Sequence, residues 1–411
     1  MPAELQSGLI LPPDAEWRPG FEVARATDAY VATIPVAERT KSDAYFEGGY
    51  WINAWGVLIA VLIAWLLLGT RFSARLRDFA ERRARRPFRQ ALIYGAAILS
   101  LLFVLTLPWT IYAKYYREQQ YGLSNQTLGG FLGEWGIGFA LTVAIMAVAV
   151  AGLYAIIRRV RERWVYWATG ATALFMLFVT LINPVFVQPL FNDYRSLPAG
   201  ELRESILALA RENGVPADSV YWYDASKQTK RISASVAGIG ATTRIALNDN
   251  LLNGTSAPEI RAVMAHEMGH YRLNHPVWLP LALALVMGLG YWAVDRLFAS
   301  FHRRYSERWG VRDIADLAGF PLAFAIFSVV LWLLSPVTKT IIRTAENQAD
   351  AFGLEAAREP HGFASVAMRL SQYRKIEPGA LEEILFYDHP SGRARVERAM
   401  QWLAEHPPAT Q

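Results

Sequence analysis

Six stretches of about 20 apolar residues, each nearly or wholly free of charge, constrain the fold of this chain most strongly. They cover residues 50–69, 91–113, 135–157, 164–186, 276–294 and 317–338. About 20 consecutive apolar residues form a helix that is long enough to cross the hydrocarbon core of a bilayer. As core helices of a soluble protein, six such segments would need a much larger polar shell than 411 residues supply. The sequence therefore predicts a mainly α, polytopic membrane protein with six transmembrane helices.

The composition agrees with this prediction. Hydrophobic residues make up 53% of the chain and charged residues only 19%, below the roughly 25% of soluble domains. Sixteen of the 35 arginines fall in three short connections, at 71–89, 158–163 and 303–312, which is typical of a membrane protein and not of a nucleic-acid-binding surface. The chain has no cysteine, which excludes a thiolate nucleophile and a cysteine-based zinc site. It has no Walker loop, so we do not expect ATP as a partner. Because the arginines form no phosphate-binding surface, we do not expect nucleic acid either.

The spans divide the chain into five segments. We expect an extramembrane N-terminal segment at 1–47, four transmembrane helices within 48–191, a soluble segment at 192–275, two transmembrane helices within 276–340, and a helical soluble segment at 341–411. Within the first soluble segment, β-branched and aromatic residues predict short strands near 219–223, 232–236 and 243–247. Thr255 and Pro258 predict the start of a helix that runs over 259–271.

That predicted helix contains the sequence His266-Glu267-Met268-Gly269-His270. Residues four apart share one face of a helix, so both imidazoles can reach one metal ion with Glu267 beside them. Zinc suits imidazole nitrogen, and a catalytic zinc takes three protein ligands and a water molecule. Two unconnected histidines on a helix surface are the alternative. The small apolar residues before the motif, and the presence of only seven histidines in the chain, favour the metal site.

A third ligand must come from another part of the chain, because His275 follows the motif too closely to match the third histidine of metzincins. The best candidate is Glu346, with Asp350 one turn later on the same helix face, where it could hydrogen-bond a ligating histidine. A solvated carboxylate is the alternative interpretation of Glu346. The two motif histidines precede the fifth predicted span and Glu346 follows the sixth, so two crossings return the chain to one side of the membrane. All three ligands can therefore meet there.

At these residues the chain resembles the type I CAAX prenyl proteases, integral-membrane zinc metallopeptidases of the gluzincin type. The resemblance covers most of the chain and rests on five separated segments in the same order, at residues 121–129, 244–252, 266–275, 346–352 and 388–390. It implies that His266, His270 and Glu346 bind one catalytic zinc ion, that Glu267 is the general base, and that Asp350 supports a ligand.

The resemblance also implies a ring of membrane helices around a water-filled chamber, with the zinc domain and its small β-sheet facing inward. His389 matches a family histidine that could hydrogen-bond the substrate or the developing oxyanion, and Arg395 is a second candidate donor. Substrate would bind as an added β-strand beside the edge strand at 232–238. The expected contacts are Ser233, Ala234, Ser235 and Val236.

Two residues near this strand depart from the family pattern. Arg231 stands where the family usually has histidine, and Ser233 stands where it usually has asparagine. The preference of the substrate subsites is therefore expected to differ. The first of the seven family spans also has no counterpart, which leaves six.

The function implied is zinc endopeptidase. A zinc-activated water would attack the peptide bond, and Glu267 would take its proton and pass it to the leaving amine. The substrate would be a peptide or protein, lipidated or membrane-inserted, in CAAX-type processing or in membrane-protein quality control; the cysteine-free composition favours a bacterial inner membrane. Two alternatives remain: an inactive chamber protein that binds lipidated peptides, and a transporter, disfavoured because the spans contain almost no ionisable residues.

The orientation in the membrane is open between two predictions. The positive-inside rule puts the three arginine-rich connections in the cytoplasm and the zinc domain on the outer side. The family resemblance implies a zinc domain in the cytosol.

Overall fold

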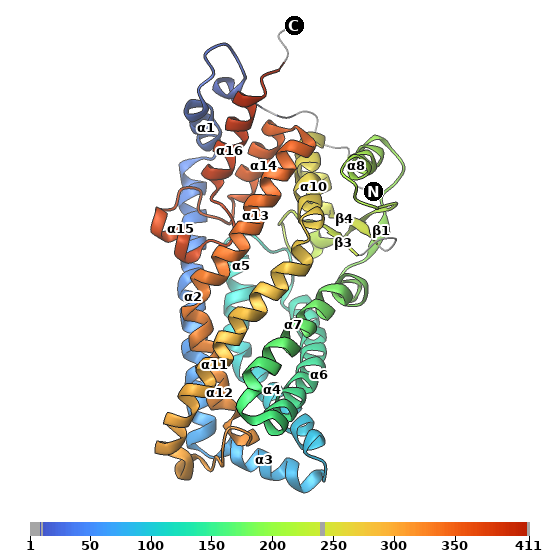
Figure 1. The fold of residues 1–411 in the computed structure, drawn as a ribbon. Helices are drawn as coiled ribbons and strands as arrows, with labels where there is room; N and C mark the ends of the chain where they lie inside the picture. Colours follow the sequence, from blue (N-terminus) through green and yellow to red (C-terminus); the bar gives the residue numbers. More distant parts are fainter. Residues whose placement is uncertain (1–8, 10, 239–242, 409–411) are drawn as a thin grey trace.

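Long apolar helices form one end of the molecule, and a small sheet with shorter helices forms the other (Figure 1). The computed structural model describes residues 9, 11–238 and 243–408. Each apolar stretch lies wholly or mostly in one or two of these helices: α2 (Val36–Gly69), α4 (Pro87–Ile111), α6 (Leu128–Val160), α7 (Trp164–Ile182), α11 (His275–Trp309) and α12 (Phe320–Leu333), which continues after a bend into α13 (Ser335–Ala357). The stretches 91–113 and 164–186 run on into π-helical turns, and the stretch 317–338 begins in a 3-10 turn. The prediction of a mainly helical membrane fold with a small sheet is confirmed.

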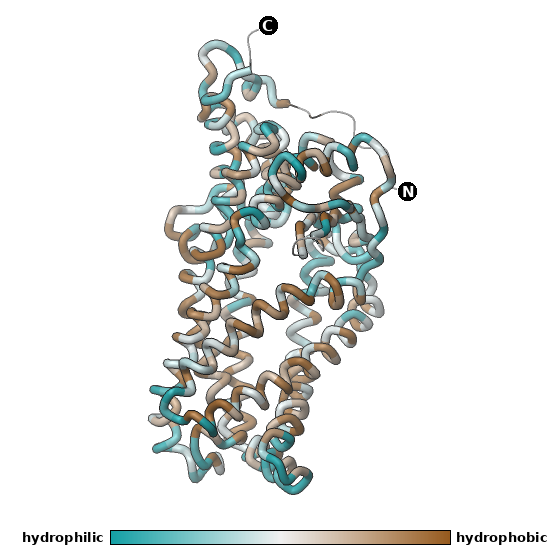
Figure 2. The backbone as a smooth tube through the Cα atoms, turned by 45° about the vertical axis from the view of Figure 1, so that its right-hand side comes forward, coloured by the Kyte–Doolittle hydropathy of each residue, from teal (hydrophilic) through white to brown (hydrophobic). Residues whose placement is uncertain are grey.

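The outer faces of these helices are apolar. Figure 2 shows hydrophobic residues along their length and hydrophilic residues at both ends of the molecule. Large side chains such as Trp55, Leu174, Phe178, Leu285 and Trp292 are more than half exposed. So much exposed apolar surface is unusual in a water-soluble protein, whereas in a membrane it would contact the lipid chains.

The number of crossings remains a prediction. Within residues 11–238 and 243–408, four helices are long and apolar enough to cross a membrane, or five if the α12–α13 pair, bent by 54°, is one broken span. One of the four is the stretch Leu128–Leu190, with 63 residues. A straight helix of that length would measure about 95 Å, three times the hydrocarbon core of about 30 Å. The short 3-10 turn Arg161–Arg163 divides it into α6 and α7, and the count of six depends on treating these as two spans.

The membrane helices pack around an internal space. Helix α4 packs against α6, α7 against α11, and α12 against both α2 and α11. A cavity of about 930 Å³ lies among α2, α4, α6 and α12. Its wall is apolar at Ile63, Phe103 and Met146, and polar at Glu118 and Glu134. The cavity is the counterpart of the chamber that the sequence led us to expect.

The sheet has four short strands: β1 (Tyr194–Ser196), β2 (Val220–Tyr223), β3 (Ala234–Ala237) and β4 (Arg244–Asn248). Their spatial order is β1-β2-β4-β3, with β2 parallel to β4 and the outer two strands antiparallel to their neighbours. Strands β2, β3 and β4 match the predicted positions within two residues, whereas the three-residue β1 was not predicted. Strand β3 is an edge strand, as expected.

The remaining helices surround the sheet or cap the bundle. They are α1 (Val23–Ala32), α3 (Phe72–Arg83), α5 (Arg117–Gln120), α8 (Glu201–Glu212), α9 (Asp249–Gly254), α10 (Ala257–Arg272), α14 (Pro360–Leu370), α15 (Ala380–Phe386) and α16 (Gly392–Glu405). Helix α10 begins at a capping box in which Ser256 and Glu259 bond each other's backbone. It packs against α13 and α14 on one side and against β3 on the other.

The contact between α10 and α13 is unusually close. A Cβ atom built on Gly269 would lie 3.1 Å from Cα of Ala349, and one built on Gly353 would lie 3.0 Å from the backbone nitrogen of His266. A side chain at either glycine would push the helices apart. The small residues therefore set how near the two helices stand.

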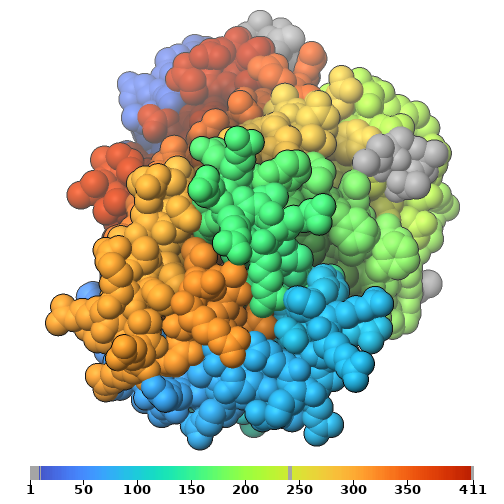
Figure 3. Space-filling view, turned by 60° about the horizontal axis from the view of Figure 1, so that its bottom comes forward, coloured from blue at the N-terminus to red at the C-terminus, as the bar shows by residue number. Residues whose placement is uncertain are grey.

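The arginine-rich connections lie at the opposite end of the molecule from α10. Helix α3 and the connection after α11 form that end, which Figure 3 brings forward. Arg77 of α3 is buried there against Asp316, and Arg312 pairs with Glu81 at 2.7 Å. Helices α1 and α16 lie at the same end as α10.

This arrangement predicts the orientation in the membrane. With the arginine-rich end in the cytoplasm, alkaline phosphatase fused after residue 411 should be active in a bacterial host, and a fluorescent protein at the same place should stay dark. A matched fusion at residue 84, between α3 and α4, should give the reverse pattern. A fluorescent, phosphatase-negative C-terminal fusion would show the cytosolic orientation of the family instead.

Candidate metal centre

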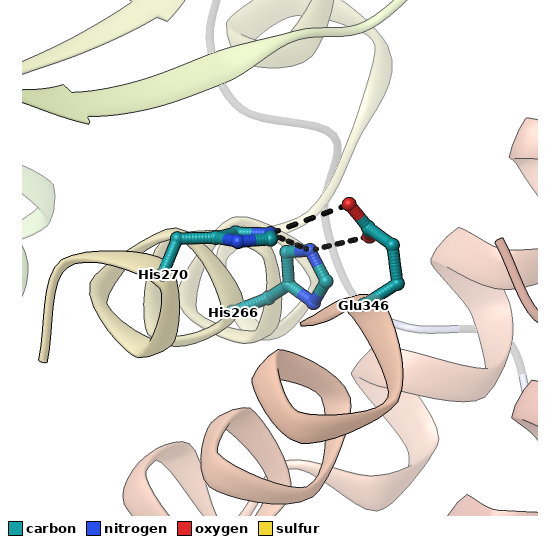
Figure 4. A group of neighbouring side chains, drawn as sticks. All are labelled: His266, His270 and Glu346. Atoms are coloured by element: carbon teal, nitrogen blue, oxygen red, sulfur yellow. Dashed lines mark hydrogen bonds and ion pairs between the residues drawn. The ribbon is translucent and has the colours of Figure 1, made fainter. Parts of the chain in front are cut away.

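Two neighbouring helices bring His266, His270 and Glu346 together. The two histidines lie one turn apart on α10, and Glu346 points at them from α13 (Figure 4). One ligand atom from each residue lies within 4.8 Å of the others. The two Nε2 atoms are 3.2 Å apart, and the Glu346 oxygens lie 3.3 Å from Nε2 of His266 and 3.5 Å from Nε2 of His270. The three predicted ligands thus meet at one point, and their binding of zinc stays a prediction.

Hydrogen bonds behind the two imidazoles fix which nitrogen faces the centre. Nδ1 of His266 lies 2.8 Å from Oδ1 of the buried Asp350, which can only accept while it is ionised. Nδ1 of His270 lies 2.8 Å from Nδ1 of His275, whose Nε2 lies 3.1 Å from Oε1 of Gln348. If the Gln348 oxygen accepts from His275, then Nδ1 of His275 must accept from His270. In the neutral rings, both inward Nε2 atoms therefore carry lone pairs.

This donor set fits a cation. Two facing lone pairs 3.2 Å apart repel each other, and Oε2 of Glu346 is buried without a hydrogen-bond partner among the described residues. Two imidazole nitrogens and one carboxylate oxygen are a ligand set that zinc takes in catalytic sites. A proton can serve in place of the metal: burial lowers the pKa of His266, but Asp350 and Glu346 outweigh burial and raise it to about 9. The centre therefore favours positive charge.

The carboxylates beside the centre are held ionised. Burial opposes ionisation of Glu346, yet His266 and His389 lower its pKa to about 2. Burial likewise opposes ionisation of Asp350, but Arg395 and His266 keep its pKa well below the usual range. Arg395 is itself buried and bonds Asp350 through Nε and one terminal nitrogen. We predicted that Arg395 is a second candidate donor to the oxyanion. In the structure its guanidinium donates to Asp350, and the donor role remains a prediction.

Glu267 lines a pocket of about 170 Å³ next to the centre. Burial raises the pKa of its carboxyl group to about 7, with a smaller contribution from the charge of Glu346. A group with a pKa near the working pH can both accept and return a proton. The walls of this pocket also include His389 and the start of the β3 segment, Ile232, Ser233 and Ala234.

His389 reaches the centre through Glu346. Its Nε2 lies 3.2 Å from Oε2 of Glu346, and its Nδ1 lies 2.8 Å from Oδ1 of Asp388. The imidazole is thus oriented from behind and presents Nε2 to the pocket. This position suits the predicted donor role, which remains a prediction.

Two residues of the site were missed from the sequence. His275 was considered only as a ligand and set aside, and Gln348 was given no role. The turn between α10 and α11 brings His275 back onto His270, because Asn274 adopts a left-handed conformation with φ of 56°. The signal that could have found His275 is its position directly after Asn274, a residue type that tolerates this conformation.

The His270–His275–Gln348 chain predicts an effect on metal affinity. Replacing His275 by Ala should weaken zinc binding about 10- to 100-fold, because the ring of His270 loses the partner that fixes its orientation and tautomer. Affinity is measured by competition with a chelator. The matched control is His302→Ala, since His302 lies on the same helix but bonds the Val311 carbonyl at 3.1 Å, far from the centre. Equal zinc affinity in both variants would contradict the assignment.

Comparisons with known proteins show the family of this chain and a shared fold. Residues 196–403 match the family described as peptidase family M48, and residues 24–193 match the one described as CAAX prenyl protease N-terminal, five membrane helices. The chain is 31% identical over 349 residues to the Bacillus subtilis protein named uncharacterized metalloprotease YhfN, covering 84% of this chain and 81% of that one.

More distant relatives carry a more specific name. CAAX prenyl protease 1 of Saccharomyces cerevisiae is 25% identical over 335 residues, which cover 77% of this chain and 73% of the yeast protein. The crystal structure of S. mikatae Ste24p matches with a TM-score of 0.73 at 23% identity, over 90% of this chain and 89% of that one. That likeness shows a shared fold.

Proposed function

This chain belongs to peptidase family M48, with the CAAX prenyl proteases among its relatives, and from this premise we propose that it is a zinc endopeptidase whose general base is Glu267. In this proposal His266, His270 and Glu346 hold one zinc ion. The observation that carries it is the convergence of two lone pairs and a buried, unsatisfied carboxylate oxygen beside the pocket that Glu267 lines. The protein is an integral membrane metalloprotease by family.

Each polar group of the pocket has a task in peptide hydrolysis. A bound zinc ion would supply a Lewis acid that lowers the pKa of water and polarises the scissile carbonyl. Glu267 would accept the proton of the attacking water and return it to the nitrogen of the leaving amine, which its pKa of about 7 allows near neutral pH. When the His389 ring carries both protons, Nδ1 donates to Asp388 and Nε2 can donate to the oxyanion, an effect typically worth about 10²- to 10³-fold in rate.

The substrate is proposed to pair with the free edge of β3. The carbonyl of Ser233 accepts from the backbone nitrogen of Asn248 in β4, at 2.9 Å. Because alternate residues of an antiparallel pair bond the same neighbour, the backbone groups of Ala234 and Val236 point to the opposite, unpaired side. Ala234 also lines the pocket with Glu267, which supports this edge as the substrate strand.

The cavity among the membrane helices supports a substrate that comes from the bilayer. The segment before β3 separates it from the catalytic pocket, and Arg231 of that segment lines the cavity. Arg231 bonds Glu118 at 2.8 Å and Tyr45 at 2.7 Å, so it is held away from the catalytic pocket. A membrane-protein segment, as in quality control, and a lipidated tail, as in CAAX-type processing, both suit a partly apolar cavity. The proposal covers both.

Glu267→Gln tests the proposal. Gln is close to Glu in size and cannot accept the proton, so the variant should keep its fold and metal but lose about 10²- to 10⁴-fold in the rate of peptide cleavage. The inactive variant should still bind the peptide. Bound peptide should slow hydrogen exchange at the outward amides of Ala234 and Val236, measured by mass spectrometry.

The control is Glu162→Gln, which changes an exposed carboxylate of the Arg161–Arg163 turn at the opposite end of the molecule and should leave the cleavage rate unchanged. Cleavage by the Glu267 variant within a few-fold of wild type would place the base elsewhere. Unchanged exchange in β3 with peptide bound would argue for a different binding groove. Wild-type protein that binds peptide but never cleaves it would support the inactive chamber protein.

A further inference from the structure

The pocket beside the metal centre contains two arginines in different situations. Arg395 is buried and bonds Asp350 with two nitrogens. Arg374 is half-buried, lines the same pocket as Glu267 and His389, and its guanidinium forms no hydrogen bond or ion pair with any residue that the structure describes. Its guanidinium carbon lies 6.0 Å from the centre of the Tyr373 ring.

The backbone of Arg374 is firmly held although its side chain is not. The residue lies between α14 and α15, and its carbonyl accepts a hydrogen bond of 2.9 Å from the buried Ser42 of α2. The next residue, Lys375, pairs with Glu47 at 2.7 Å and with Glu382 at 3.0 Å, and its carbonyl accepts from Tyr387 at 2.9 Å. These contacts fix the segment that presents the guanidinium to the pocket.

No carboxylate in the described part of the chain forms an ion pair with Arg374. Burial, and then the charge of Arg395, lower its pKa, while Asp388 and Glu346 act in the opposite direction. Neither carboxylate pairs with Arg374: Asp388 bonds His389, and the Glu346 oxygens point at the imidazoles of the centre. A partly desolvated charge without a partner is unfavourable, and an anionic ligand would relieve the cost.

We propose that Arg374 binds a carboxylate of the peptide substrate and gives the enzyme a preference for an acidic group near the scissile bond. The inference rests on the proposed function, since a strand paired with β3 would pass the pocket that Ala234 and Arg374 both line. The planar guanidinium matches a carboxylate with two parallel hydrogen bonds. The carboxylate can belong to an acidic side chain or to the C-terminus of the substrate.

The test uses one quenched-fluorescent peptide that the wild type cleaves, made in matched versions. In one series, a single Glu is moved through the positions on each side of the cleaved bond, and each peptide has a neutral twin, a matched peptide with Gln in place of Glu. In a second series, the C-terminus is either free or amidated at increasing distances from that bond. Values of kcat and KM are measured for wild type, Arg374→Gln, Arg374→Lys and the control Arg393→Gln. Arg393 is a surface arginine paired with Asp28 and Glu377 outside the pocket.

The wild type should prefer the carboxylate version at one position by on the order of 10- to 100-fold in kcat/KM, mainly through KM. Arg374→Gln should lose this preference and cleave the neutral twin as the wild type does. Arg374→Lys should keep part of it, and Arg393→Gln should keep all of it. A preference in the first series identifies a side-chain carboxylate, and one in the second identifies the C-terminus.

Two outcomes overturn the inference and leave the proposed function standing. The first is wild-type cleavage that does not distinguish carboxylate from amide at any position in either series. The second is an Arg374→Gln variant that slows all peptides equally, which would indicate a structural role. Failure of the proposed function looks different: no peptide of either series would be cleaved faster by wild type than by Glu267→Gln.

Discussion

The close packing of α10 on α13 is the contact on which the candidate site depends. Helices usually pack with their axes 8–10 Å apart, and the lower end of this range needs small residues at the contact. Here Gly269 meets Ala349 and Gly353 meets the backbone of His266. Only at such a short separation can a glutamate on one helix reach two histidines on the other. A larger side chain at Gly353 would press on the backbone of His266 and push the two helices, and with them the ligands, apart.

The charges of the site are organised around that contact. Asp350, one turn after Glu346, is wholly buried and bonds both His266 and Arg395. Removing one member would leave an unpaired buried charge, which is costly. The centre itself is left with excess negative potential and inward lone pairs, which a divalent cation satisfies. Arg374 forms no ion pair with any carboxylate of the described residues. We therefore expect its positive charge to attract a carboxylate of the substrate, as the negative centre attracts a cation.

Much of the fold could be predicted from the sequence, because a run of about 20 apolar residues marks the position of a membrane helix. The apolar stretches coincide with the observed helices to within a few residues at most of their ends. Helix α2 begins at Val36, well before its apolar run, since its first turns pack outside the membrane part. The arginine-rich helix α3 was not foreseen, as its charges conceal a buried face that contains Arg77. Strand β1 was missed because three residues carry too little pattern.

The site was partly predictable for a similar reason. Spacing identified His266 and His270, and counting crossings brought Glu346 to the same membrane side. The roles of His275 and Gln348, the commitment of Arg395 to Asp350 and the isolation of Arg374 depend on how distant segments meet in space. No local pattern records those contacts. A left-handed residue such as Asn274 shows the limit well: its identity permits the turn, but only packing selects it.

Metal content of the purified protein tests the central claim most directly. Elemental analysis of the wild type and of the control His406→Ala, which changes an exposed histidine outside the site, should give about one zinc ion per chain. The double variant His266→Ala, His270→Ala, folded as judged by circular dichroism, should contain essentially none. A double variant that keeps its full zinc content would contradict the account.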